Sequence, residues 1–419
     1  MKRELFVFIQ LPGEATPVVC GKFSHEDSIG TGLGTFVYGK SYLGNEKAVP
    51  LDPVALPLKE FEFTTSLTQG YFGAIRDAIP DDWGKHVAQK LYGKAAETTF
   101  DLLSLPAADR FGALSFSENS RPPKQEPSLA KAKDISSALL SSLDKIDRNL
   151  AISDAEKRAA LLVGGGTHAG GARPKLTIQE GNVIWLVKLN RFNDRVNNVR
   201  IEAAMLDLAF ACEIDVPEHE VKKFGDKDAL LVRRFDRTVT PSGILKHRAV
   251  SAATVFRADE AYARSVFVGS YIRFSREFSR WCTDIRIDRH QLFRRMAFNC
   301  LTGITDDHER NHALVAEGVH FRLAPAFDLS PAPPTTRRKQ QALQIGGEGA
   351  ESTRENLMSA CDQFDLTHPQ ASEIIDAVKG KIATQWRAKF AARAVSEEDT
   401  EIMAACFDHD FFENGQKPG

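Results

Sequence analysis

The first 115 residues of the chain carry short apolar runs that glycine, proline and aspartate interrupt at close intervals. Runs of this kind, bounded by turn-forming residues, are typical of strands. The predicted strands cover residues 6–11, 17–23, 36–39 and 51–53. A turn at Gly13 and Glu14 would join the first two strands, and the others would continue the same small sheet. Between residues 72 and 91 the pattern becomes helical, with apolar positions three and four residues apart after 80–84.

The remainder of the chain alternates between helical and strand patterns. A polar, proline-rich stretch at 118–132 predicts an exposed linker, and the pattern at 134–163 predicts one amphipathic helix. Further strands are predicted at 176–178, 183–189, 229–235 and 320–324, the first two as a hairpin, and further helices at 201–212 and 293–301. From about residue 352 onward the pattern predicts successive helices, including 373–390. The whole predicts an α+β protein whose C-terminal part is mostly helical.

Composition narrows the class of protein. The 419 residues, 42% hydrophobic and 26% charged, are typical of a globular protein with two or three domains. A formal net charge of −2 provides no global basic field for nucleic acid. The six cysteines form no C-x-x-C pair, which argues against a zinc site or a disulfide framework and favours a reducing cytoplasm. The apolar run at residues 5–9 stalls at Gln10, which favours a first strand over a signal peptide, and no apolar stretch is long enough to cross a bilayer.

The most informative motif places Asp306 five positions before Asn311, with Asp328 following shortly after. In kinase-type folds this order groups a base with two magnesium ligands: the first Asp accepts the proton of the attacking hydroxyl, while the Asn and the later Asp hold the metal ions that bridge the ATP phosphates. His308 lies inside the motif and would hydrogen-bond the loop or contact phosphate. The alternative interpretation is a polar loop between a helix and a strand, because Asp-x4-Asn is common by chance.

Two upstream features support the kinase interpretation. Residues 164–175 form a glycine-dense loop that enters a strand, and glycines let backbone N–H groups approach a phosphate chain closely. A flexible connector would have the same composition. Lys188 then lies inside an apolar strand, where its charge is costly unless paired; a nucleotide phosphate and Glu202, at the start of the next helix, would pair it. The alternative is an alternating strand with Lys188 facing water.

The strand at 229–235 ends in the run 232–237, where the chain of a two-lobed kinase crosses between lobes and its backbone meets the adenine. The alternative is a surface strand end with an Arg–Asp pair. Each feature alone is weak. Their order along the chain, from glycine-rich loop to Lys188, Glu202, hinge, Asp306, Asn311 and Asp328, is much more specific.

These motifs resemble the HipA-like serine/threonine kinases, which are toxins of bacterial toxin–antitoxin pairs, over nearly the whole chain. The strings that carry the resemblance include Ile79-Pro80-Asp81-Asp82-Trp83-Gly84, Gly170-Gly171-Ala172-Arg173-Pro174-Lys175, Arg234-Phe235-Asp236-Arg237, Asp306-Asp307-His308-Glu309-Arg310-Asn311 and Ala326-Phe327-Asp328-Leu329. The resemblance implies a two-lobed protein-kinase-like core with an extra N-terminal β-rich subdomain. Its parts would be that subdomain at 1–115, a linker and helix at 116–150, a kinase N-lobe at 151–240 and a helical C-lobe at 241–419.

The resemblance also implies roles for individual residues. Asp306 would be the catalytic base, Asn311 and Asp328 the Mg²⁺ ligands, and Lys188 the lysine that binds the ATP phosphates, with Glu202 as its partner. The remaining nucleotide contacts would come from Gly170, Gly171, Ala172 and His308, and from the hinge backbone of Arg233 and Phe235. The acceptor would be a serine or threonine of a protein such as an aminoacyl-tRNA synthetase. The partner would be a small, HipB-like helix-turn-helix antitoxin, through which any contact with DNA would be mainly indirect.

One departure from the family concerns self-inactivation. Many members carry a regulatory serine in the glycine-rich loop, whereas Thr167 is the only hydroxyl residue between residues 164 and 175 here. Either Thr167 is the autophosphorylated residue or this control is absent. Two other functions stay open: a kinase for a small molecule or lipid, whose catalytic loop has a similar pattern, and a non-catalytic regulator that binds an antitoxin. The charged set argues against the last, because a non-catalytic protein has no need to keep it in a cleft.

Overall fold

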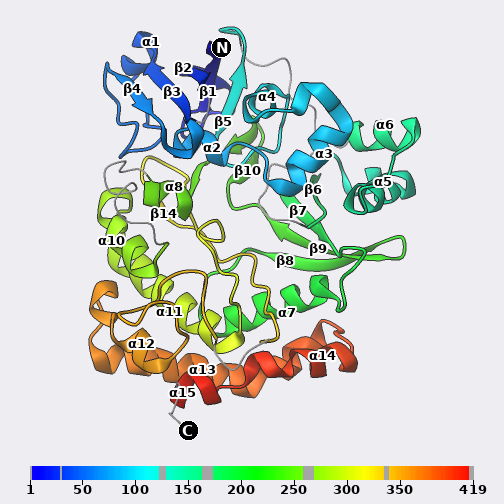
Figure 1. Ribbon diagram of the computed structural model, residues 1–419, viewed down its shortest axis with the longest axis vertical. Helices are drawn as coiled ribbons and strands as arrows, with labels where there is room; N and C mark the ends of the chain where they lie inside the picture. Colours follow the sequence, from blue (N-terminus) through cyan, green and yellow to red (C-terminus); the bar gives the residue numbers. More distant parts are fainter. Residues whose placement is uncertain are drawn as a thin grey trace.

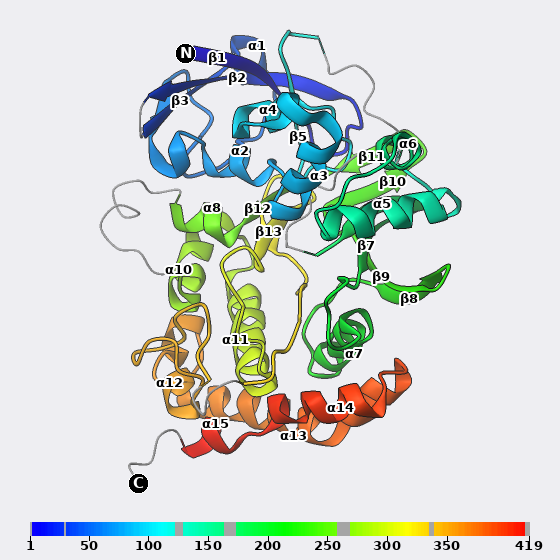
Figure 2. The ribbon, with the colours of Figure 1, turned by 45° about the vertical axis from the view of Figure 1, so that its right-hand side comes forward.

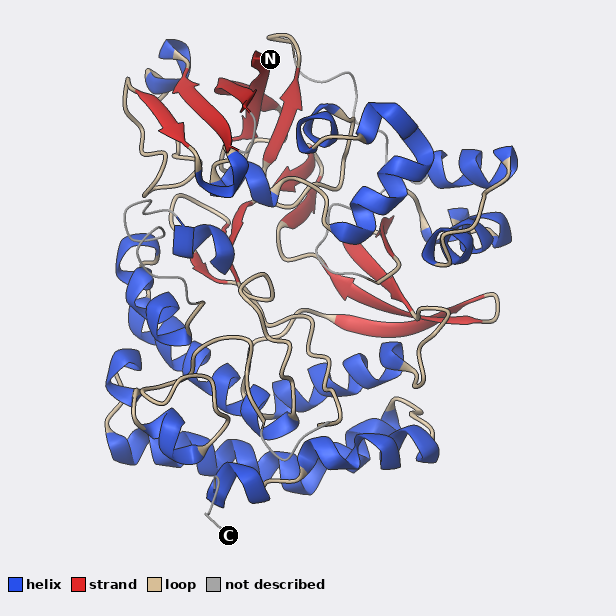
Figure 3. Cartoon of the chain, viewed as in Figure 1, coloured by secondary structure: helices blue, strands red, loops and turns tan. Residues whose placement is uncertain are grey.

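The computed structural model describes residues 2–28, 31–121, 129–162, 173–257, 269–334 and 339–414. It is a mixed α/β protein with several separate sheets. Figures 1 and 3 show strands gathered at the N-terminal end of the molecule and along one side, and long helices across the opposite end. Thr167, Gly170, Gly171 and Ala172, which the sequence assigns to the glycine-rich loop, lie outside the described residues.

An antiparallel sheet of order β4-β3-β2-β1-β5 forms the N-terminal region. Its strands are β1 (Lys2–Gln10), β2 (Pro17–Ser28), β3 (Thr31–Tyr38), β4 (Glu62–Thr65) and β5 (Leu114–Ser117). The accompanying helices are α1 (Lys40–Leu43), α2 (Gly73–Asp77), α3 (Asp82–Tyr92) and α4 (Thr99–Ser104). The predicted hairpin is confirmed as β1 and β2, and Gly13 in the turn has a positive φ of 77° that glycine adopts readily.

The predicted strand at 51–53 is wrong. Only an isolated bridge joins Asp52 to Leu56, and the side chain of Asp52 accepts hydrogen bonds from the N–H groups of Val54 and Ala55. Aspartate favours such a local turn, and Pro53 has no N–H to donate to a ladder. A turn therefore replaces the strand.

A second antiparallel sheet, of order β6-β7-β9-β8, is the framework of the central region. Its strands are β6 (Lys175–Glu180), β7 (Val183–Leu189), β8 (His219–Phe224) and β9 (Lys227–Arg233). Successive residues of β9 face opposite sides of the sheet. Leu231 packs with α3 and with α5 (Ser137–Asp147), whereas Leu230 and Val232 belong to the core that contains α7 (Asn198–Ala211). Helix α3 of the N-terminal region thus covers one face of this sheet, as Figure 2 shows.

The single helix predicted at 134–163 is instead two helices, α5 and α6 (Asp154–Leu162). The backbone of Asn149 has a φ of 55°, in the left-handed region that interrupts a right-handed helix. Likewise, the helical pattern at 72–91 divides into α2 and α3, because Pro80 lies between them and the side chain of Asp81 caps the start of α3.

The C-terminal region is mostly helical, as predicted. Its helices are α8 (Ala252–Arg257), α10 (Tyr271–Trp281), α11 (Ile285–Thr302), α12 (Arg354–Met358), α13 (His368–Ala392), α14 (Glu397–Ala404) and α15 (Asp410–Asn414). Its short strands are β10 (Arg237–Thr240) paired with β11 (Gly243–Lys246), and β12 (Arg248–Ser251), β13 (Ala313–Ala316) and β14 (Arg322–Leu323) in one sheet. Helices α7, α11 and α13 pack around one buried core. Among the described residues, no helix is both long and apolar enough to cross a membrane.

A buried ionic cluster joins the N-terminal region to the chain that follows β9. Asp236 accepts hydrogen bonds from the guanidinium groups of Arg234 and Arg237 and from the backbone N–H of Gly112. The two arginines in turn donate to backbone carbonyls of the 109–112 segment, including that of Arg110. The N-terminal region and the end of β9 are therefore held in a fixed relation around the cavity described next.

Candidate active site

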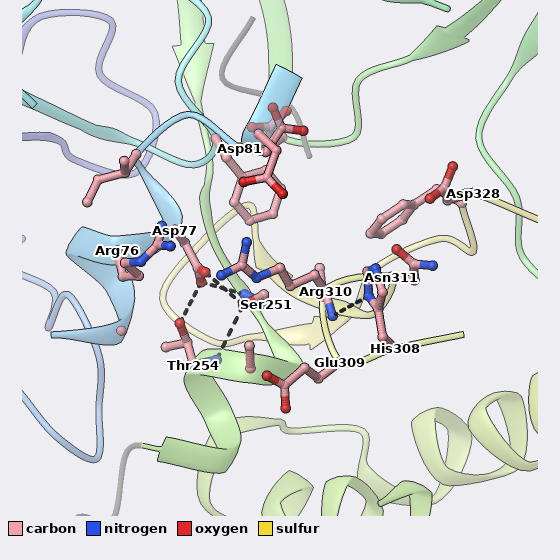
Figure 4. A pocket seen from close by; sticks show the side chains of 18 of the residues that line it. Arg76, Asp77, Asp81, Ser251, Thr254, His308, Glu309, Arg310, Asn311 and Asp328 are labelled. Carbon is pink, nitrogen blue, oxygen red and sulfur yellow. Dashed lines mark hydrogen bonds between the residues drawn. The ribbon is translucent and has the colours of Figure 1, made fainter. Parts of the chain in front are cut away.

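One cavity of about 1230 Å³ lies where the N-terminal region, the second sheet and the C-terminal region meet. Its wall includes Lys188 from β7, Asp306, His308 and Asn311 from the loop after α11, and Asp328. Figure 4 shows His308, Asn311 and Asp328 facing the same space, with Asp77 and Asp81 of the N-terminal region across from them. The structure thus brings together residues from positions 188 to 328 that the sequence predicted to share a site.

Lys188 is held by two carboxylates. Its Nζ lies 2.6 Å from Oε1 of Glu202 and 2.8 Å from Oδ1 of Asp328. Lys188 is buried on β7 and Glu202 is buried in the first turns of α7, so Lys188 does not face water as an alternating strand would require. A buried ammonium is tolerated when carboxylates pair it, and this arrangement meets that condition.

The pKa values of this group follow from the same contacts. Burial alone would lower the pKa of Lys188, but the carboxylates of Asp328 and Glu202 raise it well above its usual range. Burial alone would raise the pKa of Asp328, and the ammonium of Lys188 outweighs this effect and lowers it. Near neutral pH, Lys188 is a cation and Asp328 an anion, which are the charge states needed to bind phosphate and a divalent cation.

The backbone places the side chain of Asp328 in this position. Asp328 has a φ of 59°, in the left-handed region, and its carbonyl oxygen accepts a hydrogen bond from the N–H of Ser330 at 3.0 Å. A non-glycine residue with such a φ is uncommon, although aspartate tolerates it better than most. The tight turn directs the carboxylate at Lys188 instead of continuing an extended strand.

The loop from Asp306 to Asn311 is held by hydrogen bonds of its own. The N–H of His308 donates to the carbonyl of Asp306 at 3.0 Å, and the N–H of Asn311 donates to the carbonyl of His308 at 2.9 Å. The Nδ2 of Asn311 also donates to the carbonyl of Asp306 at 3.1 Å. The amide oxygen of Asn311 is the atom that remains to bind a metal, while the exposed carboxylate of Asp306 takes no part in these bonds.

A buried network beneath this loop was not predicted from the sequence. The carboxylate of Asp307 accepts hydrogen bonds from the hydroxyl of Tyr271, from Nδ2 of Asn299 at 2.9 Å and from Nε2 of His312 at 2.9 Å. These partners come from α10, from α11 and from the residue just before β13. Asp307 therefore fixes the loop from below, and its neighbour Asp306 remains on the cavity side.

A second unpredicted pair lies in the cavity wall. Lys175, at the start of β6, pairs with Asp81, whose Oδ2 lies 3.2 Å from its Nζ, and both side chains are buried. Lys175 also faces Lys188 across the β6–β7 ladder. Ninety-four residues separate Lys175 from Asp81, so no local pattern could reveal the pair. The available signal was a lysine next to the apolar residue Leu176, where a charge is costly.

The predicted hinge residues lie at the end of β9. The N–H of Arg233 donates to the carbonyl of Glu218 at 2.8 Å, so a contact between Arg233 and adenine would have to use its carbonyl oxygen. Phe235 lines the cavity, and its ring packs against those of Phe111 and Phe327 at centroid distances of 6.1 and 5.6 Å. An aromatic wall of this kind suits a flat heterocyclic base.

The donor atoms fit magnesium better than they fit a transition metal. Mg²⁺ prefers oxygen ligands and keeps several waters, needing only one or two protein groups beside substrate phosphates. The amide oxygen of Asn311 and the carboxylate of Asp328 provide such a set. Within the described ranges, no group of three or more His, Cys, Asp or Glu side chains is placed to hold a metal by itself.

Comparison with known proteins identifies the family. The HipA-like C-terminal domain matches residues 167–386, and the HipA N-terminal domain matches residues 18–117. The chain therefore belongs to the HipA-like family.

Two relatives show how far the likeness extends. Over 316 aligned residues, the chain is 23% identical to the putative kinase Y4mE of Sinorhizobium fredii. The aligned region covers 70% of this chain and 71% of that protein. The fold of this chain is similar to that of HipA from Shewanella oneidensis MR-1, which was solved with HipB and its operator DNA. The TM-score is 0.68 at 17% identity, over 96% of this chain and 95% of that one. The predicted membership of the HipA-like family is confirmed.

Proposed function

We propose that this protein is an ATP- and Mg²⁺-dependent serine/threonine protein kinase that acts as the toxin of a toxin–antitoxin pair. The observation that carries the proposal is the position of Lys188, which contacts Glu202 and Asp328 in the same cavity that Asp306 and Asn311 line. Kinases need this combination: a phosphate-binding cation, two metal ligands and a base, grouped around one space. The kinase name of the Sinorhizobium relative is in agreement with it.

Each residue has a distinct task in this proposal. Bound Mg-ATP supplies the phosphoryl group and the metal charge that offsets its negative oxygens. Lys188 binds the phosphates, and Glu202 orients its ammonium. Asn311 and Asp328 hold Mg²⁺ through their side-chain oxygens. Asp306, on the loop that Asp307 anchors, accepts the proton of the acceptor hydroxyl at its carboxylate. His308, between Asp306 and Asn311 in the sequence, contacts the phosphates or supports the loop.

The two-lobed layout is part of the proposal. The second sheet with α7 would be the N-lobe, with boundaries near 151 and 240, and the helical region from 241 onward the C-lobe. The residues before about 115 would form the additional subdomain. The backbone near Arg233 and Phe235 would contact the adenine, and Gly170, Gly171 and Ala172 would cover the phosphates.

The expected partners follow from the family. The Shewanella protein was solved with HipB and operator DNA, and we extend the same kind of assembly to this chain. A small helix-turn-helix antitoxin would bind the kinase and carry the DNA contact. The acceptor would be a protein of the translation apparatus, such as an aminoacyl-tRNA synthetase, and the protein would act in the cytoplasm. Thr167 is the candidate for autophosphorylation.

Calorimetric titration with ATP, with and without Mg²⁺, tests the nucleotide part of the proposal. Wild type is expected to bind ATP more tightly with Mg²⁺ present, and Asp328→Asn to lose this dependence because the replacement removes the ligand charge. Asp376→Asn, the same change on the exposed face of α13, is the matched control and should bind as wild type does. Equal ATP affinity with and without Mg²⁺ in wild type would argue against the proposal.

A further inference from the structure

The cavity is larger than a nucleotide site requires. Small-molecule pockets usually enclose about 300–1,000 Å³, and this cavity of about 1230 Å³ continues from Lys188 to the N-terminal region, where Thr64, Gln69 and Phe72 line it. The part nearest Lys188 has the groups for a triphosphate. In the proposed function, the part beyond Asp306 would hold the molecule that receives the phosphate.

Two arginines from different regions converge on this second part. Arg76 lies on α2 of the N-terminal region, and Arg310 lies in the loop with Asp306 and Asn311. Figure 4 shows the side chain of Arg310 extending from its loop toward Asp77 and Arg76. Burial, and next the positive charge of Arg310, lower the pKa of Arg76, so the two guanidinium groups repel each other. An anion bound between them would relieve this repulsion.

The neighbouring acidic groups do not supply that anion. Glu309 forms an ion pair with Arg257 at 2.6 Å. Asp77 accepts hydrogen bonds of 2.7 Å from the N–H and hydroxyl of Ser251 and from the hydroxyl of Thr254. In the part of the chain that the structure describes, neither Arg76 nor Arg310 forms an ion pair with a carboxylate.

The local charge balance is therefore positive. Two acidic side chains, Asp77 and Asp82, act on Arg76, and Asp82 is exposed and pairs with Lys85 at 3.4 Å. Even a fully ionised Asp77 leaves one surplus positive charge when it is counted with Arg76 and Arg310. Because both arginines line the cavity, this surplus is accessible to a ligand inside it.

We infer that Arg76 and Arg310 form a subsite for an anionic side chain of the protein acceptor, next to the hydroxyl that is phosphorylated. This inference rests on the proposed function and adds to it the chemistry of the acceptor. Planar guanidinium groups bind carboxylates and phosphates with paired hydrogen bonds, so a glutamate, an aspartate or a phosphorylated residue would suit the subsite. Arg310 is one residue from Asn311 and four from Asp306, which places the subsite beside the site of transfer. The N-terminal region, through Arg76, would thus help to select the acceptor.

The test uses the full-length protein, Mg-ATP and peptides with one central serine. Each flanking position is fixed in turn as glutamate, phosphoserine, alanine or lysine, and initial rates of phosphate transfer are compared. Wild type should prefer an acidic residue over alanine at one or more flanking positions by about tenfold, as expected for one close charge pair. Glutamate and phosphoserine peptides distinguish a carboxylate ligand from a phosphate ligand.

Three variants identify Arg76 as the residue responsible. Arg76→Gln should lose most of the acidic preference while the affinity for Mg-ATP stays unchanged, and Arg76→Lys, which keeps the charge, should retain part of the preference. Arg387→Gln alters an exposed arginine of α13 that pairs with Glu401, and should behave as wild type. If Arg76→Gln fails to fold, Arg76→Lys still tests the charge at this position, because it should phosphorylate a peptide with an acidic flanking residue faster than one with a flanking lysine.

The outcomes separate the two proposals. Transfer to serine without any acidic preference, or an acidic preference that Arg76→Gln leaves intact, overturns the subsite and leaves the kinase in place. A wild-type protein that binds Mg-ATP and phosphorylates no peptide contradicts the protein-kinase function, and the subsite, which then has no acceptor, is overturned with it.

Discussion

Replacing Asp236 with asparagine removes one negative charge from the buried cluster that joins the N-terminal region to the end of β9. The Oδ2 of Asp236 accepts hydrogen bonds from Arg234 at 2.8 Å, from Arg237 at 2.9 Å and from the N–H of Gly112 at 2.9 Å, and its Oδ1 accepts another from Arg234 at 2.9 Å. All three charged side chains are buried, so solvent does not screen them.

The magnitude follows from these contacts. An asparagine oxygen in place of Oδ2 could keep three of the four hydrogen bonds, but without the charge that strengthens them. Its amide NH₂, in place of Oδ1, would face the Nε–H of Arg234, and two donors cannot form a hydrogen bond with each other. Two buried guanidinium groups would then lose the carboxylate that both of them contact. Removing one partner of a buried ion pair costs about 3–5 kcal/mol, and we expect Asp236→Asn to lower the free energy of unfolding by about this amount.

Urea unfolding followed by tryptophan fluorescence measures this effect. Asp376→Asn is the control, because Asp376 accepts two hydrogen bonds from Arg354, at 2.8 and 3.0 Å, on an exposed surface. Exposed ion pairs contribute about 0–1 kcal/mol, so the control should shift the unfolding midpoint little. Equal shifts for the two variants would refute the reasoning, since burial would then not determine the strength of the cluster.

Three further predictions concern pH, nucleotide binding and the catalytic loop. Burial would raise the pKa of Asp236, but Arg234 and Arg237 lower it far below 3.8. The contribution of Asp236 to stability is therefore complete at neutral pH and is lost as pH falls below about 4. In that range the unfolding free energy of wild type should decline more steeply than that of Asp236→Asn. Lys188→Met should weaken Mg-ATP binding about 10–100-fold by calorimetry, because a charge-assisted contact is worth about 1.5–3 kcal/mol, whereas Lys40→Met, at an exposed lysine of α1, should not. Asp307→Asn should reduce the rate of phosphate transfer, measured by single-turnover kinetics, without abolishing ATP binding. The reason is that it loosens the loop and not the nucleotide contacts. An unchanged rate would show that the buried network is not needed.

The sequence allowed the site to be predicted where the cost of a charge was visible locally. Lys188 stands in an apolar strand, and a lysine there needs partners, so Glu202 on the next helix could be named from the sequence alone. The contact between Lys188 and Asp328 was harder to predict from the sequence, since it depends on the left-handed turn at Asp328 and spans 140 residues. The sequence grouped these residues correctly but indicated no geometry.

Other parts of the site arise only from tertiary structure. Asp81 and Lys175 meet because α3 packs on the second sheet, and Arg76 and Arg310 line one cavity because α2 and the loop after α11 both border it. No periodicity or local motif links such distant positions. The fold prediction failed for a similar reason at Asn149, where one left-handed residue divides a continuous amphipathic pattern into two helices.

Phosphate transfer from ATP with Asp306 as the base is the central claim, and mass spectrometry tests it most directly. The purified protein is incubated with Mg-ATP, alone and with a bacterial lysate whose own kinases have been inactivated, and phosphoserine and phosphothreonine are counted on all proteins. Asp306→Asn keeps the backbone contacts of the loop and removes only the base, and Thr167→Ala tests autophosphorylation in the glycine-rich loop. The account predicts transfer by wild type, reduced by about 10²–10⁴ in Asp306→Asn. Equal transfer by Asp306→Asn, or no transfer by wild type to itself or to any lysate protein, would contradict it.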